Sequence, residues 1–122
     1  RPAGALRSAA MAAETILHIT TEDGWAAARE AGALVAPSLG EEGFIHCSTR
    51  AQVEATAKRI FRGSGDLVLL EVDVEKLAAP LKWERATDVG EEFPHIYGPL
   101  NADAVVGTIA LPEGDDGYRL AR

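Results

Sequence analysis

The sequence contains a single cysteine and no long apolar run. Cys47 stands alone among 122 residues, which excludes an intrachain disulfide and a cysteine-rich zinc site. No apolar run approaches the roughly 20 residues that cross a bilayer. The N-terminal residues also lack the continuous apolar segment of a secretory signal. We therefore expect a cytoplasmic protein in a reducing compartment.

Basic residues are also scarce. Lys and Arg total 12 against 19 Asp and Glu, which gives a formal net charge of -7. The resulting field repels phosphate backbones and anionic membrane surfaces. We expect no general nucleic-acid partner and no membrane partner, whereas a small ligand, even an anionic one, can still bind a local cluster of donors.

The composition is that of one globular domain. The chain is 47% hydrophobic and 25% charged, and 122 residues are enough to bury a modest core. We expect the domain to span residues 14–112. Residues 1–13 are expected to be a disordered or tag-like segment, and residues 113–122, rich in Gly and Asp, a flexible solvated tail.

Local patterns predict an α+β fold with two helices and five or six short strands. Thr20, Thr21 and Asp23 supply N-cap chemistry for a helix that Gly32 can end. Thr49 with Gln52 resembles a capping box for a helix reaching about Phe61. Alternating or continuous apolar residues predict strands at 15–20, 44–47, 67–74, 81–86, 93–97 and 105–111.

Two glycine-containing segments are predicted to be loops. Residues 37–43 contain Pro and Gly, which are typical of a loop. Residues 63–66 precede a strand, whereas a phosphate-binding loop follows a strand and opens a helix. The second segment is therefore interpreted as a turn. The strand after it is apolar enough to be central in a sheet.

Each of the three histidines is followed two residues later by a hydroxyl side chain. Because side chains alternate across a strand, each pair is expected to share one face, with the intervening residue in apolar packing. We expect the pairs to line one polar pocket; the alternative is three separate, half-buried histidines at strand ends. The pairs are His18 and Thr20, His46 and Ser48, and His95 and Tyr97.

These side chains suit both ligand binding and proton transfer. Imidazole and hydroxyl groups donate and accept hydrogen bonds to sugar hydroxyls, phosphate oxygens or amides, and His also carries protons near neutral pH. A three-histidine metal site, completed by Glu84 or Glu92, is the competing interpretation. The histidines lie on separate segments without metal-ligand spacing, so no metal is expected.

Three further residues have alternative roles. Cys47 is a possible nucleophile beside His46, but alternation places neighbouring side chains on opposite faces, which favours a buried thiol. Trp83 is either a core aromatic or a pocket wall that touches ligand. Arg50 belongs to the solvated face of its helix or reaches a phosphate from the first turn.

Five segments together resemble the bacterial family known as domain of unknown function 952. They are ILHIT, W followed by AREAG, SLGEEGFIHCS, LVLLEVD and FPHIYGPLN, within residues 16–111. The resemblance implies an ADP-ribosyltransferase-like fold, in which a split, strongly bent β-sheet holds NAD in a cleft.

The resemblance also implies roles for individual residues. His18 and Thr20 look like the His-x-Ser/Thr element that contacts an NAD ribose, with backbone near Ile19 holding the nicotinamide amide. His46 and Ser48 would then lie beneath the cleft, and His95 and Tyr97 near its opposite wall. Glu84 and Glu92 are the candidates for the counterpart of the transferase glutamate.

The leading hypothesis is thus a nucleotide-binding protein of the NAD class, or an ADP-ribosyltransferase-related enzyme. In the catalytic case His46 or His95 acts on a proton or stabilises charge, and Glu84 or Glu92 opposes an oxocarbenium ion. The second hypothesis is a non-catalytic binding or accessory module that has lost the transferase acid. A metal hydrolase is third.

Overall fold

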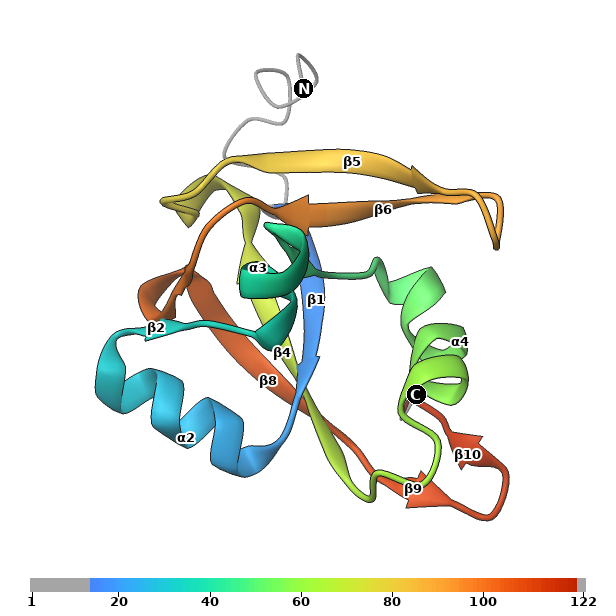
Figure 1. Ribbon diagram of the computed structural model, residues 1–122. Coiled ribbons are helices and arrows are strands. Elements are labelled where there is room, and N and C mark those ends of the chain that lie inside the picture. Colours follow the sequence, from blue (N-terminus) through green and yellow to red (C-terminus); the bar gives the residue numbers. More distant parts are fainter. Residues whose placement is uncertain (1–13, 121–122) are drawn as a thin grey trace.

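Two three-stranded antiparallel sheets form the frame of the molecule (Figure 1). The structure is a computed structural model, and it describes residues 14–120. The first sheet has the order β1 (Thr15–Thr20), β4 (Leu67–Asp73), β8 (Val105–Leu111). The second has the order β3 (Ile45–His46), β6 (Glu91–Ile96), β5 (Leu81–Ala86). The predicted α+β class is confirmed, while the expectation for residues 1–13 falls outside the described residues.

Two helices begin and end close to the predicted signals. Helix α2 (Glu22–Ala31) starts at Thr21, whose side chain accepts a bond from the Gly24 amide, and ends at Gly32 with φ 87°. Helix α4 (Arg50–Ile60) starts at the predicted capping box, in which both reciprocal bonds are present. The two helices lie to either side of β1 in Figure 1. No helix among residues 14–120 is long and apolar enough to cross a membrane.

The expected loop at residues 37–43 is instead a short helix, α3 (Pro37–Glu42). Pro37 occupies the first turn, where its fixed φ suits a helix and its missing N–H costs nothing. Gly43 ends the helix with φ 91°. Pro and Gly therefore mark the two ends of a helix here.

Several elements are too short to be recognised from a sequence pattern. Strands β2 (Ala33–Leu34) and β7 (Leu100–Asn101) pair with each other. Two 3-10 helices, η1 (Val74–Lys76) and η2 (Ala102–Ala104), follow β4 and β7. Two-residue strands carry almost no periodicity, so the expected five or six strands are too few.

The two sheets are joined where β1 passes the end of β3. Leu17 and Ser48 exchange both backbone N–H to O bonds, each 2.8 Å long. Immediately before this bridge, the Cys47 amide donates to the Pro94 carbonyl of β6 at 3.0 Å. The chain thus leaves β6 and crosses to β1 within two residues.

Apolar side chains form two clusters on the two faces of β4. Val68 and Leu70 face a cluster that includes Ile45 and Ile96 of the second sheet. Leu67 and Leu69 face the other cluster, which includes Val53 of α4. A strand buried on both faces and central in its sheet accounts for the nearly continuous apolar run predicted to be central.

The expectation of a solvated tail is wrong for residues 113–120. Strands β9 (Glu113–Gly114) and β10 (Gly117–Tyr118) form a hairpin. Tyr118 is fully buried, and its hydroxyl shares its one proton between the Phe61 and Gly65 carbonyls, at 3.0 and 2.7 Å. Burial of an aromatic side chain in the α4 cluster offsets the flexibility that the neighbouring Gly and Asp residues suggested.

Glu113 fastens this hairpin to the turn between α4 and β4. Its two carboxylate oxygens accept bonds from the amides of Gly63 and Gly65, at 2.6 and 2.8 Å. Both glycines have positive φ, which aims their amides at one point. The two amide bonds lower the pKa of Glu113 below its ordinary value.

We predict that Glu113→Gln destabilises the protein near neutral pH, because an amide oxygen without charge replaces the carboxylate. A group with a lowered folded-state pKa stabilises above its unfolded pKa, and this contribution disappears as the pH falls through the folded pKa. The difference in urea midpoint between the two proteins should therefore shrink below about pH 4. Asp115→Asn, a substitution of an exposed acid in the same hairpin, is the control; an equal effect from it contradicts the prediction.

Candidate functional site

A cleft of about 1270 Å³ opens between β1, the chain leaving β3, and the α2, α3 and α4 helices. This volume exceeds the roughly 300–1,000 Å³ that is typical of small-molecule sites. The predicted residues that line the cleft are His18, Ile19, Thr20, His46, Ser48 and His95. The structure therefore brings all three histidines to one cavity.

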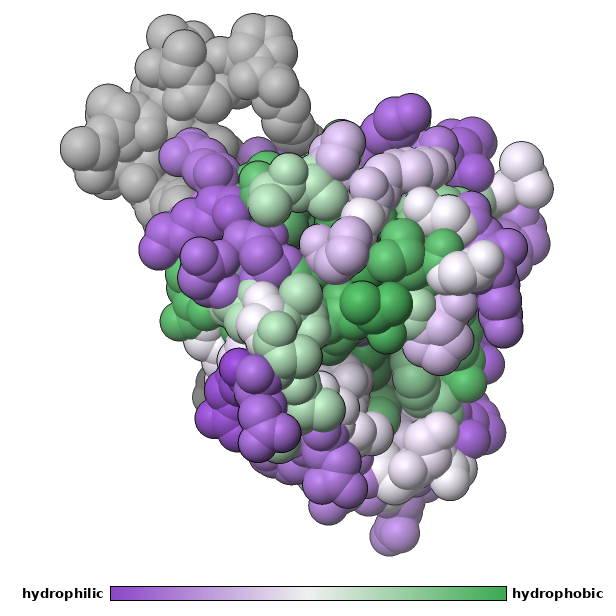
Figure 2. Space-filling view, turned by 60° about the vertical axis from the view of Figure 1, so that its left-hand side comes forward, coloured by the Kyte–Doolittle hydropathy of each residue, from purple (hydrophilic) through white to green (hydrophobic). Residues whose placement is uncertain are grey.

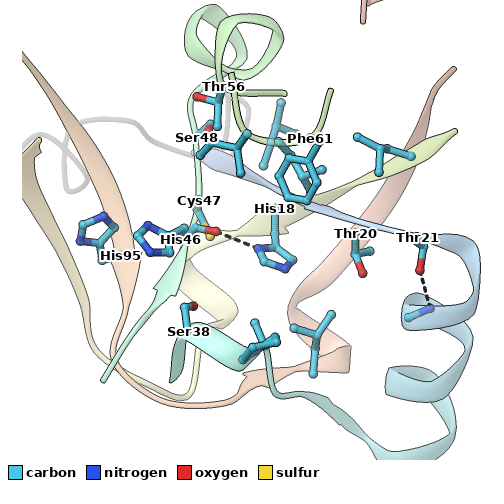
Figure 3. Close-up of a pocket in the computed structure, with 18 of the residues that line it drawn as sticks. His18, Thr20, Thr21, Ser38, His46, Cys47, Ser48, Thr56, Phe61 and His95 are labelled. Carbon is cyan, nitrogen blue, oxygen red and sulfur yellow. Dashed lines mark hydrogen bonds between the residues drawn. The ribbon is translucent and has the colours of Figure 1, made fainter. Parts of the chain in front are cut away.

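His18 lies in the floor of the cleft as a buried, neutral imidazole. Its Nδ1 donates to the His46 backbone carbonyl at 2.8 Å, and its ring points into the cavity (Figure 3). Burial lowers the pKa of His18, although the carbonyl bond acts in the opposite direction. Because a carbonyl only accepts, the proton lies on Nδ1, and Nε2 carries a free lone pair.

The His46 and His95 rings meet because their residues pair directly across β3 and β6. Their ring centroids are 5.1 Å apart and nearly perpendicular. Phe44, which precedes β3, stacks on the His95 ring at 4.1 Å between centroids, with planes 16° apart. The intervening Cys47 and Ile96 are buried in the first cluster, as the alternation predicted.

Glu84 and Tyr97 lie behind His95 and do not line the cleft. One carboxylate oxygen of Glu84 accepts bonds from His95 Nδ1 at 2.7 Å and from the Tyr97 hydroxyl at 2.5 Å. The Tyr97 bond, and then the His95 bond, lower the pKa of Glu84, while the same contact raises the pKa of Tyr97. Glu84 is thus a carboxylate at neutral pH and is directed at His95.

Three other predicted residues lie away from the cleft. Glu92 is exposed on β6, where it pairs with Arg85, one register position from the Glu84 and Phe93 pair. Alternation puts its side chain on the face opposite His95. Arg50 is exposed in the first turn of α4. Trp83 is partly buried against the first cluster, so it packs in the core rather than against the cleft.

The sequence interpretation missed several cleft residues because they lie on helices or in loops. Phe61 and Ile60, at the end of α4, contribute apolar surface, and Ile60 is 59% exposed. Thr56 also lines the cleft, and its buried hydroxyl has no hydrogen-bond partner among the described residues. A helical wheel of α4 identifies these cleft residues only when the position of the cleft is already known.

The walls of the cleft are mainly apolar, with few charges. Alanines of α2, together with Leu34 and Val35, form one wall, and Val35 is 65% exposed. Figure 2 shows apolar surface gathered at the centre of one face and bordered by hydrophilic residues. Among the lining residues that the structure describes, Arg59 is the one permanent cation and Asp88 the one carboxylate.

Within residues 14–120, no group of three or more His, Cys, Asp or Glu side chains is placed to hold a metal ion. The three histidines share the cleft without converging on one point. Two of their Nδ1 atoms are engaged by other groups, the His46 carbonyl and the Glu84 carboxylate. The arrangement offers hydrogen bonds and proton transfer to a ligand.

Cys47 is buried beneath the cleft, and burial strongly raises the pKa of its thiol. A thiol in this state is a poor nucleophile, because the thiolate is the reactive form.

We predict that Cys47 in the folded protein reacts with a disulfide reagent at least about 10²-fold more slowly than in urea. The reaction is followed by the absorbance of the thiolate that the reagent releases. Similar rates in the folded and the urea-unfolded protein would contradict the burial of Cys47.

Solved structures with high similarity include those of protein CC0527 from Caulobacter crescentus. The crystal structure of protein CC0527 from Caulobacter crescentus has a TM-score of 0.77 and 37% identity, covering 86% of this chain and 92% of that one. The solution NMR structure of the same protein has a TM-score of 0.72 and 37% identity, covering 85% and 90%.

No curated protein matches the chain significantly. Residues 19–108 match the family described as "Protein of unknown function (DUF952)". This stretch contains the histidines at positions 46 and 95 and most of both sheets. Together with the 37% identity to the Caulobacter protein, the match shows that this chain belongs to the DUF952 family.

Proposed function

We propose that the cleft binds a nucleotide of the NAD class, with a ribose hydroxyl donating to His18 Nε2. The observation that carries the proposal is the fixed tautomer of His18. The His46 carbonyl oxygen lies 2.8 Å from His18 Nδ1 and keeps the proton on that nitrogen, while burial keeps the ring neutral. A buried acceptor with a fixed direction discriminates in favour of ligands that present a hydroxyl.

The other lining groups are consistent with such a ligand. Thr20 and Ser48 offer hydroxyls on both sides of His18 (Figure 3). Apolar walls suit the flat faces of a base or a nicotinamide ring. Arg59 supplies a cation for a phosphate despite the net charge of -7. The junction of two sheets at the Leu17 bridge also favours the split sheet of an ADP-ribosyltransferase-like fold.

The proposal is tested by isothermal titration with NAD, ADP-ribose and nicotinamide. We expect ADP-ribose to bind and His18→Phe, which keeps a ring but removes the acceptor, to weaken binding by about tenfold, the value of one net hydrogen bond. Arg50→Gln, a substitution of an exposed cation outside the cleft, should leave the affinity unchanged. Failure of all three ligands to bind the unmodified protein would overturn the proposal.

A non-catalytic module is the second candidate, and the position of Glu84 favours it. Glu84 and Glu92, the two candidates for the transferase acid, are not among the residues that line the cleft. A protein of this kind would bind ADP-ribose without releasing nicotinamide from NAD. Chromatographic assay of nicotinamide during prolonged incubation separates the module from an NAD-cleaving enzyme.

A further inference from the structure

The three histidines of the cleft differ in what holds them. His18 is buried and bonded to a neutral carbonyl, which offers no negative charge to a protonated ring. The His46 side chain is 53% exposed and pairs with Glu42, which is itself 48% exposed. Exposed pairs of this kind are weak and hold a side chain loosely. Neither histidine is both largely buried and hydrogen-bonded to a carboxylate.

His95 combines both properties. Its side chain is 11% exposed, and Oε1 of Glu84, whose side chain is 39% exposed, lies 2.7 Å from Nδ1. In the neutral ring the proton must then lie on Nδ1, because a carboxylate only accepts, and Nε2 has a free lone pair. When Nε2 takes up a proton, the adjacent carboxylate stabilises the imidazolium.

The His95 ring is also fixed in orientation. Phe44 stacks on its face at 4.1 Å, while Glu84 holds one edge. The ring lines the cleft, whereas Glu84 does not. The Glu84 carboxylate therefore contacts His95 from outside the cleft, and His95 is the group that contacts a ligand.

Tyr97 completes the arrangement from the same face of the sheet. Its hydroxyl donates to the oxygen of Glu84 that also accepts from His95, at 2.5 Å. The Lys82 ammonium lies 4.8 Å from the Tyr97 ring centroid. Both groups favour the charged form of Glu84, and the tyrosine limits its rotation.

We propose that His95 is the general base of a group transfer from the ligand of the cleft, and that Glu84 is its positioning residue. This inference rests on the proposed NAD-class ligand. The acceptor is water or an alcohol. His95 Nε2 removes the O–H proton as the oxygen bonds to C1′ of the nicotinamide ribose.

The atoms and charges of this step balance. The bond between C1′ and the nicotinamide nitrogen breaks, and its electron pair stays with the ring, which leaves as neutral nicotinamide. The proton on His95 is then released to solvent, so no oxidant or metal is required. General-base catalysis of this kind contributes about 10² to 10⁴-fold to a rate.

The kinetic test compares two glutamates of the same β5–β6 hairpin. Glu84→Gln keeps the shape of the side chain but removes its charge. It should lower kcat for nicotinamide release by about 10²-fold while changing the affinity for ADP-ribose less than twofold. Glu92→Gln, on the opposite face, is the matched control and should leave both quantities unchanged. Equal loss in the two variants, or loss of ADP-ribose binding with Glu84→Gln, would overturn the inference.

A second measurement does not depend on turnover. Nitrogen-15 NMR of histidine-labelled protein should assign the neutral His95 proton to Nδ1, and a neutral ring protonated on Nε2 would overturn the role of Glu84. Binding of ADP-ribose without nicotinamide release by the unmodified protein would overturn this inference and leave the proposed function intact. Absence of binding would overturn the proposed function itself.

Discussion

The contact between Leu17 and Ser48 holds the two sheets together, and the cleft depends on it. Two backbone bonds of 2.8 Å fix β1 against the residues that follow β3. The same approach places the His46 carbonyl 2.8 Å from the His18 ring. The tautomer of a side chain in one sheet is therefore set by the backbone of the other, so assembly of the frame also prepares the floor of the cleft.

Burial gives the histidines of this fold distinct chemistry. A buried imidazole is costly unless its polar atoms are satisfied, and the protein meets this requirement in two ways. At His18 a neutral carbonyl accepts the proton, which suits an imidazole that stays neutral. At His95 a carboxylate accepts it, which suits an imidazole that gains charge. Identical side chains thus differ because of the acceptor placed behind each ring.

The sequence predicted the long elements well because their signals are local. Strands 15–20, 81–86 and 105–111 and the capping box at Thr49 follow from alternation and side-chain chemistry within a few residues. The Glu84 contact with His95 was not predictable, because it depends on the register of β5 against β6. The burial of Tyr118 likewise depends on a tertiary cluster, which no local pattern of Gly and Asp reveals.

Pro94 gives the junction of the sheets its position. In the register of β3 and β6, Cys47 lies opposite Pro94. The Pro94 carbonyl accepts the Cys47 amide, but a proline has no amide hydrogen to donate in return. One of the two hydrogen bonds of this pair is therefore missing, and pairing with β6 does not continue past Cys47. An imino acid in a central strand thus frees the next residue, Ser48, to cross to β1.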